Sequence, residues 1–295
     1  MKKLISFEKK TIVSAASILI LLTAFAQGQN LFVSNGVGSI YEFTPDGTRS
    51  TFASGLNQPY GLAFDSAGNL FAADNFNYSI YKFTPDGTRS TFFSSNSIYY
   101  SFLDLAFDST GNLFTDITYG GNILKFTPNG KQSIFASDSK NPWGLTCDRS
   151  NNLFVSNQVP AEIYKFTPGG TGSLFASVPY QSTGLTFDSA GNLFVSAINF
   201  REETGYIYKF TPDGTRTTFA LGLNHPLDLA FDSAGNLFEV DFGSGSIYKF
   251  TPDGTRSTFA SGLVQPRFLA FQPVPEPATL LLLGLGAVII RKSRV

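Results

Sequence analysis

The sequence contains very few of the side chains that most often carry chemistry. Its 295 residues include one cysteine, one histidine, one methionine and one tryptophan. With Cys147 alone no internal disulfide can form, so the fold depends on packing and on sheet hydrogen bonds even in an oxidising compartment. His225 is the only imidazole, and a Ser-His-Asp arrangement would have to be built on that one side chain.

Charge is scarce as well. Only 15% of the residues are charged, and the formal net charge is -1. Proteins that bind nucleic acid need clustered Lys and Arg to displace counterions, so this composition argues against nucleic acid as a partner. The sequence is instead rich in aromatic residues, with 31 Phe and 12 Tyr, a bias that indicates one packing unit copied many times.

Residues 1–26 predict a signal peptide. Four lysines come before the apolar run that begins at Thr11, and Ala24-Phe25-Ala26 supplies a cleavage site of small residues. We expect signal peptidase to cleave there, so that the mature chain begins near Gln27. The alternative is an N-terminal membrane anchor, which fits the short apolar stretch and the small-residue site less well.

The last residues, 274–295, predict a second targeting signal. Pro275, Glu276 and Pro277 are followed by an apolar segment, 278–290, and then by a basic tail. This arrangement resembles the PEP-CTERM sorting signal. The resemblance implies a Gram-negative host, a short transmembrane helix that holds the chain in the inner membrane, and cleavage near the motif by an exosortase associated with exopolysaccharide production. The alternative is a tail anchor that is never cut.

Between these two signals one sequence unit recurs six times. The phrase Phe-Thr-Pro starts at Phe43, Phe83, Phe126, Phe166, Phe210 and Phe250, with spacings of 40, 43, 40, 44 and 40 residues. Each unit also contains Asn-Leu-Phe and a phrase similar to Leu-Ala-Phe, which divide it into four short strands. Four antiparallel strands in about 40 residues are typical of a propeller blade, whereas a parallel β-helix needs shorter rungs. We therefore expect an all-β, six-bladed β-propeller over 27–273.

The two ends of the repeat region predict how the ring closes. The region begins at an Asn-Leu-Phe strand with no preceding partner, and it finishes with 268–271, the innermost strand that the first blade lacks. Pairing of these strands would leave no open edge. The phrases Gly-Leu-Ala-Phe-Asp, Gly-Asn-Leu-Phe and Ile-Tyr-Lys-Phe resemble NHL-type repeats and the streptogramin-lyase-like and gluconolactonase-like propellers, over roughly 30–272. The Gly-His and Trp-Asp marks of WD repeats are missing.

Antiparallel geometry separates two faces of the expected ring. One, which we call the hairpin face, carries the turns after the first and third strands of each blade, such as Asp65–Asn69 and Pro85–Gly87. These turns hardly vary, and we interpret them as scaffold. The other, which we call the loop face, carries the remaining connections, including both length insertions, within 94–101 and 199–205. Function usually lies on such variable loops.

The loop face also carries carboxylates near the expected channel. Asp104 and Asp228 begin the innermost strands of the third and sixth blades, so in a six-fold ring they face each other. With Asp74 and Asp241, and with Asn35 and Asn157 at other second-strand ends, they could hold Ca²⁺ or another divalent ion through oxygen ligands. The resemblance to gluconolactonase-like propellers implies a divalent ion at this place, although the full ligand set of those propellers is missing here. The alternative is that these acids cap backbone groups or are solvated.

A set of larger side chains on the loop face predicts ligand contacts, with aromatic rings that could stack on sugars. The set comprises Tyr60, Tyr99, Tyr100, Trp143, Phe200, Arg201, His225 and Arg267. The alternative is that the aromatic residues pack the channel rim. His225 occupies a position held in other blades by Gln or Asn, which indicates a loop residue, and Cys147 replaces a repeated Phe, which indicates the core.

These features favour an exported, non-catalytic propeller that binds an extracellular polysaccharide or a protein partner through its loop face. The poverty of catalytic side chains and the two targeting signals are the basis for this interpretation. The alternative is a metal-dependent lactonase-like or lyase-like enzyme that uses Asp104, Asp228 and His225.

Overall fold

The computed structural model describes residues 28–97, 100–117, 121–137 and 141–274. The predicted signal peptide, Tyr99, the Pro275–Pro277 motif and the predicted transmembrane helix at 278–290 lie outside these residues. Among the described segments, no helix is long and apolar enough to cross a membrane.

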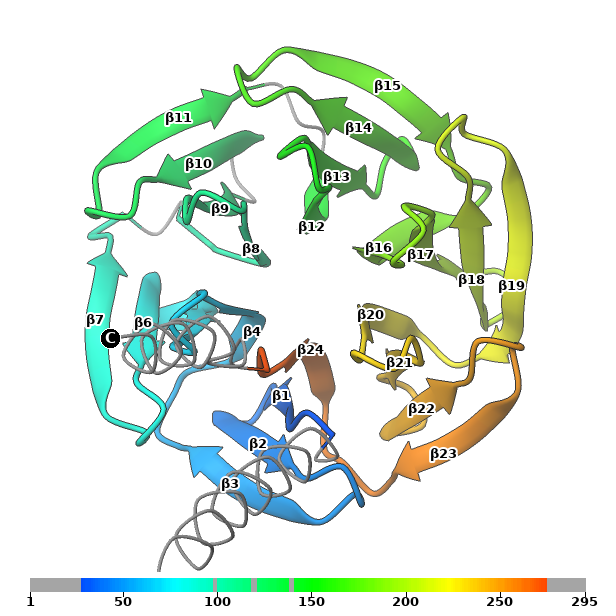
Figure 1. The fold of residues 1–295 in the computed structure, drawn as a ribbon, viewed down its shortest axis with the longest axis horizontal. Coiled ribbons are helices and arrows are strands. Elements are labelled where there is room, and N and C mark those ends of the chain that lie inside the picture. The colour runs from blue at the N-terminus through cyan, green and yellow to red at the C-terminus, as the bar shows by residue number, and fades with distance from the viewer. Residues whose placement is uncertain (1–27, 98–99, 118–120, 138–140, 275–295) are drawn as a thin grey trace, which may run out of the picture.

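Six four-stranded antiparallel sheets form a closed ring around a central axis (Figure 1). The first blade contains, from the axis outward, β24 (Pro266–Phe271), β1 (Leu31–Asn35), β2 (Ser39–Phe43) and β3 (Arg49–Ala53). The second contains β4 (Pro59–Phe64), β5 (Leu70–Asp74), β6 (Ser79–Phe83) and β7 (Arg89–Ser94), with a 3₁₀ turn at Asn75–Asn77. The third contains β8 (Leu105–Phe107), β9 (Leu113–Ile117), β10 (Asn122–Phe126) and β11 (Gln132–Ala136).

The remaining blades repeat the same order. The fourth contains β12 (Pro142–Cys147), β13 (Leu153–Asn157), β14 (Glu162–Phe166) and β15 (Gly172–Ser177). The fifth contains β16 (Gln181–Phe187), β17 (Leu193–Asn199), β18 (Thr204–Phe210) and β19 (Arg216–Leu223). The sixth contains β20 (Pro226–Phe231), β21 (Leu237–Asp241), β22 (Ser246–Phe250) and β23 (Arg256–Ala260). The insertion at 199–205 lengthens β17 and β18, so the fifth blade extends further on the loop face.

The ring closes as the sequence predicts. β24 pairs with β1 in antiparallel register, with Leu31 opposite Phe271 and Val33 opposite Leu269. The last strand of the repeat region is therefore the innermost strand of the first blade, and every sheet is complete within 28–274. The six-bladed propeller is confirmed.

The repeated turns on the hairpin face are held by their own aspartates. In the second blade, Asp65 Oδ1 accepts hydrogen bonds from the backbone N–H groups of Ala67 and Asn69, and Oδ2 accepts one from the Asn69 side chain. Gly68 has a φ of +80°, a conformation that glycine adopts without steric cost. Turn chemistry therefore explains why this phrase is repeated from blade to blade.

Phenylalanine pairs join neighbouring blades near the hairpin face. The last residue of an inner strand packs edge to face against a second-strand Phe of the preceding blade, with ring centroids 4.9–5.1 Å apart. The five pairs are Phe32–Phe64, Phe71–Phe107, Phe154–Phe187, Phe194–Phe231 and Phe238–Phe271. At the sixth interface Phe114 and Cys147 share a core cluster instead, so one ring is missing.

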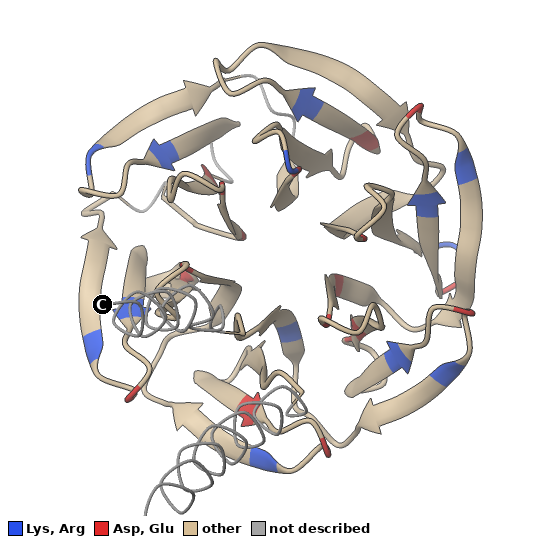
Figure 2. Ribbon diagram, in the orientation of Figure 1, with Lys and Arg blue, Asp and Glu red and all other residues tan. Residues whose placement is uncertain are grey.

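Figure 2 shows that Lys, Arg, Asp and Glu are spread around the ring. No sector of the described chain has a field of one sign in that view, which agrees with the small net charge.

Candidate functional site

At the channel mouth on the loop face, the inner strands approach one another closely. A Cβ atom on Gly61 would lie 2.5 Å from the Cα of Asp104, and one on Gly184 would lie 2.5 Å from Asp228 Oδ1. Larger residues at these two glycines would collide with the neighbouring blade. Three of the six equivalent positions around the mouth are therefore glycines, at 61, 144 and 184, and two others carry Asp104 and Asp228.

Asp104 and Asp228 bind the inner strand of the following blade. Asp104 accepts backbone hydrogen bonds from Leu105 and Leu145, both at 2.7 Å, and Asp228 accepts one from Leu269 at 2.9 Å. Both side chains are buried. Burial raises the pKa of Asp104 to about 7. Burial, and then the charge of Asp104, raise the pKa of Asp228 well above its ordinary value.

Asp74 and Asp241 hold loops of the loop face. Asp74 accepts hydrogen bonds from the backbone N–H of Asn57 and the side chain of Asn77, both at 2.8 Å. Asp241 accepts backbone bonds from Asn224 at 2.6 Å and from Ser244 at 3.0 Å, in the same manner. Nowhere in the described chain do three or more His, Cys, Asp or Glu side chains form a group that could hold a metal ion. The divalent-ion site stays a prediction, without a ligand cluster in these segments.

Three of the predicted ligand-contact residues come together at the mouth, from three different blades. The guanidinium of Arg267 lies 4.3 Å from the ring centroid of Tyr60, and its Nη1 donates a hydrogen bond of 2.8 Å to Tyr60 Oη. The Trp143 ring lies edge-on to Tyr60, with centroids 6.3 Å apart. The same guanidinium also lies 5.6 Å from the ring centroid of Phe242.

Two polar atoms in this mouth cluster, which we define as Tyr60, Trp143, Phe242 and Arg267, have no partner in the described structure. Trp143 Nε1 and Arg267 Nε are buried and make no hydrogen bond there. The ion pairs in the described segments all involve lysine, so the charge of Arg267 is not neutralised by a carboxylate among those residues. A buried donor without an acceptor is uncommon and calls for a physical explanation.

The other predicted ligand-contact residues lie elsewhere. Tyr100 packs against Phe93 and Phe102 at the edge of a core cluster, which is the rim-packing alternative. Phe200 is 54% exposed, and its ring centroid lies 5.5 Å from that of His225. Arg201 is exposed in the same loop of the fifth blade.

His225 adopts a left-handed backbone conformation, with a φ of +59°. The residues at the matching position, Gln58, Asn141 and Gln265, have φ values of 55°, 53° and 48°, and a proline follows each of the four. Asn and His tolerate this conformation better than most side chains, so backbone geometry accounts for Asn141 and His225 at this position.

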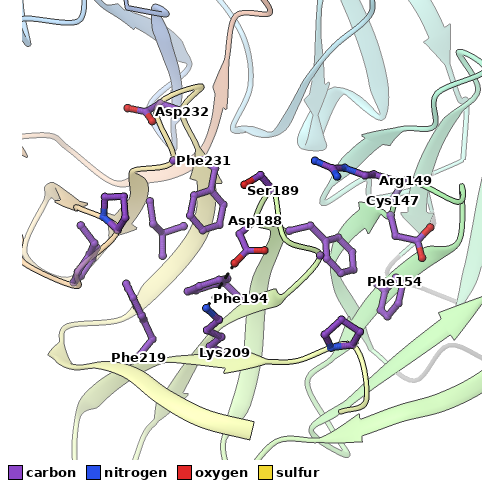
Figure 3. A pocket seen from close by; sticks show the side chains of 18 of the residues that line it. Cys147, Arg149, Phe154, Asp188, Ser189, Phe194, Lys209, Phe219, Phe231 and Asp232 are labelled. Atoms are coloured by element: carbon purple, nitrogen blue, oxygen red, sulfur yellow. Dashed lines mark ion pairs between the residues drawn. The ribbon is translucent and has the colours of Figure 1, made fainter. Parts of the chain in front are cut away.

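A cavity of about 880 Å³ opens on the hairpin face of the fourth, fifth and sixth blades. Its lining includes Cys147, Arg149, Phe187, Phe194, Lys209 and Phe231 (Figure 3). The repeated turns of the hairpin face predict scaffold, so the cavity is not expected from the repeat pattern. One turn nevertheless marks it, because Cys147 and Arg149 both differ from the residues of the sister blades.

The C-terminal segment matches a known targeting motif. Residues 273–294 fit the family model of the PEP-CTERM protein-sorting motif. The chain carries a PEP-CTERM sorting signal. The signal implies export and surface sorting in Gram-negative bacteria, with exosortase-type processing. Among curated proteins, none matches the sequence.

Solved structures show the same fold at low sequence identity. A chain of a nidogen/laminin complex is similar with a TM-score of 0.74 and 18% identity, covering 84% of this chain and 100% of that one. Virginiamycin B lyase from Staphylococcus aureus gives 0.62 and 16%, covering 82% and 87%. A gluconolactonase from Xanthomonas campestris gives 0.64 and 21%, covering 72% and 79%. At these identities the likeness establishes the fold alone.

Proposed function

We propose that this PEP-CTERM propeller is a non-catalytic binding protein that holds an acidic extracellular polysaccharide at its mouth cluster. The observation that carries the proposal is a guanidinium, on Arg267, that lies among aromatic rings and has no carboxylate partner in the described residues. An acidic sugar offers what this group lacks, because Arg binds carboxylates through paired, charge-assisted hydrogen bonds.

The rest of the mouth cluster suits a sugar ring. Tyr60 and Trp143 present aromatic surface against which the ring could stack. The four residues of the mouth cluster come from four blades, so the mouth would contact a short stretch of polymer. A polymer ligand also agrees with a protein that is exported and sorted to the surface.

The disposition of the acids supports binding without catalysis. Each of the four predicted metal-site aspartates already accepts hydrogen bonds that fix a neighbouring strand or loop, and His225 sits in a turn conformation. The alternative function, a metal-dependent lactonase-like or lyase-like enzyme, is favoured by one observation. The raised pKa of Asp104, about 7, is in the range that suits acid-base chemistry.

We infer the following route to the surface. Signal peptidase removes residues 1–26, the segment at 278–290 holds the chain in the inner membrane, and an exosortase cuts near Pro275. The protein would then bind the polysaccharide in the cell-surface matrix. A test is mass spectrometry of the mature protein, which should show a new N-terminus at Gln27 and a C-terminus near Pro275.

Calorimetric titration of residues 28–274, the complete closed ring, tests the binding function. We expect saturable binding of oligouronates and much weaker binding of neutral glucans. Arg267→Gln should weaken oligouronate binding by about 10- to 100-fold, because a charge-assisted hydrogen bond contributes a corresponding binding free energy. The matched control is Arg201→Gln, an exposed arginine on the same face but outside the mouth cluster, which should bind like the unmodified ring. Equal affinity of the two variants, or no binding at all, would contradict the proposal. Ca²⁺ binding with turnover of a lactone would favour the enzyme instead.

A further inference from the structure

One hairpin turn of the propeller differs from its sister turns at three alternate positions. The turn after β12 carries Cys147, Arg149 and Asn151. The four complete sister turns all have Phe, Ser and Gly at these positions. Asn151 keeps the turn geometry, with a φ of +61°, and its Oδ1 accepts a hydrogen bond of 2.9 Å from the backbone N–H of Ser109 in the third blade. Turn formation therefore explains Asn151, but not Cys147 or Arg149.

Both unexplained residues line the 880 Å³ cavity on the hairpin face. This volume lies within the range of about 300–1,000 Å³ that is usual for small-molecule sites. Figure 3 shows the Phe231 and Phe194 rings and the Asp188 and Ser189 turn in the cavity, with Arg149 above the Cys147 end. The cavity therefore combines aromatic walls with a cation near one end.

The other charged groups of the cavity are already paired or bonded. Lys209 Nζ lies 3.7 Å from an Asp188 oxygen and stacks over the Phe194 ring at 5.2 Å. Lys165 forms the equivalent ion pair with Asp148 at 3.9 Å. The third carboxylate, on Asp232, accepts hydrogen bonds within its own turn. Arg149 is exposed and has no carboxylate partner among the described residues.

The cysteine adds space and not reactivity. Burial raises the pKa of the Cys147 thiol to about 12, so the thiol stays neutral and does not act as a nucleophile near neutral pH. Its side chain is much smaller than the phenyl group that ends the other five inner strands. Among the three blades that line the cavity, the fourth thus has the smallest side chain at the end of its inner strand, where the fifth and sixth have Phe187 and Phe231.

We propose that this cavity is a second binding site, for a small aromatic carboxylate. The ring of the ligand lies against Phe187 and Phe231, and its carboxylate binds the Arg149 guanidinium, which matches carboxylate geometry. Binding is non-covalent. This site is on the opposite face from the mouth cluster and does not depend on polysaccharide binding there.

The test is a titration of residues 28–274 with 2-naphthoate, monitored by calorimetry and by NMR amide chemical shifts. We expect 2-naphthoate to bind at least 10-fold more tightly than its uncharged analogue 2-naphthamide. Shift changes should centre on the turns at 148–151 and 188–191. Arg149→Ser installs the residue of the sister turns, so it should fold normally, and it should abolish the preference for 2-naphthoate.

Two controls keep this test separate from the polysaccharide test. Arg267→Gln should bind 2-naphthoate unchanged, and Arg149→Ser should bind oligouronates unchanged. The proposal is overturned if the unmodified propeller does not bind 2-naphthoate at millimolar concentration, if 2-naphthamide binds equally well, or if the chemical-shift changes centre on the loop face.

Discussion

The carboxylate of Asp228 accepts a hydrogen bond of 2.9 Å from the backbone N–H of Leu269, and this bond fastens the sixth blade to the strand that closes the ring. Asp104 makes the same contact with Leu145, at 2.7 Å, between the third and fourth blades. The two acids therefore act as equivalent inter-blade contacts on opposite sides of the channel. Residues chosen from sequence as metal ligands have a structural role that needs no metal.

Removal of the Asp228 carboxylate should weaken ring closure. Asp228→Ala leaves the buried N–H of Leu269 without an acceptor, which costs about 1–3 kcal/mol of unfolding free energy. Urea unfolding of residues 28–274 measures this. The control, Asp46→Ala in an exposed turn, should cost less. A Ca²⁺-dependent stabilisation that disappears in Asp228→Ala would instead show that the carboxylate binds an ion.

Replacing Glu239 with valine should stabilise the protein. Glu239 is fully buried, and neither carboxylate oxygen has a hydrogen-bond partner in the described structure. The matching positions of three other blades hold Val33, Val155 and Val195. An unpaired buried carboxyl group is costly, so Glu239→Val should raise the unfolding free energy by about 1–3 kcal/mol at pH 7. The reverse change, Val155→Glu, should lower it.

The gain from Glu239→Val should also depend on pH. Burial, and then the charge of Asp241, raise the pKa of Glu239 well above its ordinary value of 4.5. The unfolded chain therefore loses this proton at lower pH than the folded chain. Stability contributed by this group is full below pH 4.5 and falls as pH rises toward the folded pKa. Unfolding curves at pH 4.5 and 7 should show a larger gain at pH 7, and an equal gain would contradict the buried-acid explanation.

Restoring the missing phenyl ring should strengthen the interface of the third and fourth blades. Cys147→Phe places a ring beside Phe114, as in the five existing pairs, and edge-to-face pairs contribute about 0.5–1.5 kcal/mol beyond their buried area. Thermal unfolding should show a higher midpoint. The opposite exchange, Phe187→Cys, removes the pair with Phe154 and should lower it. A lower midpoint for Cys147→Phe would mean that the space is already filled.

The sequence alone predicts the fold because each blade repeats the same local pattern of strand and turn residues. Asp65 and Gly68 form their turn through bonds within five residues, so the phrase alone reveals it. The missing inner strand was also visible, as an unmatched phrase at each end of the repeats. Because these features are local or periodic, the pattern of residues in a single sequence reveals them.

The candidate sites were less accessible because they depend on contacts between distant blades. Tyr60 and Arg267 are separated by 207 positions, and only ring closure brings them together. The roles of Asp104 and Asp228 depend on backbone N–H groups, which leave no mark in the sequence. From sequence alone Cys147 indicates a core residue, and only the folded ring shows that Cys147 and Arg149 lie beside one cavity between three blades.

The closure of the ring also fixes an orientation. β24 ends at Phe271 on the hairpin face, Gln272 donates a backbone hydrogen bond to Asn30, and the sorting motif begins at residue 273. A chain held by the segment that we propose at 278–290 would be tethered through the residues that follow Phe271, and so by its hairpin face. The mouth cluster would then face away from the membrane, and the aromatic cavity would face toward it.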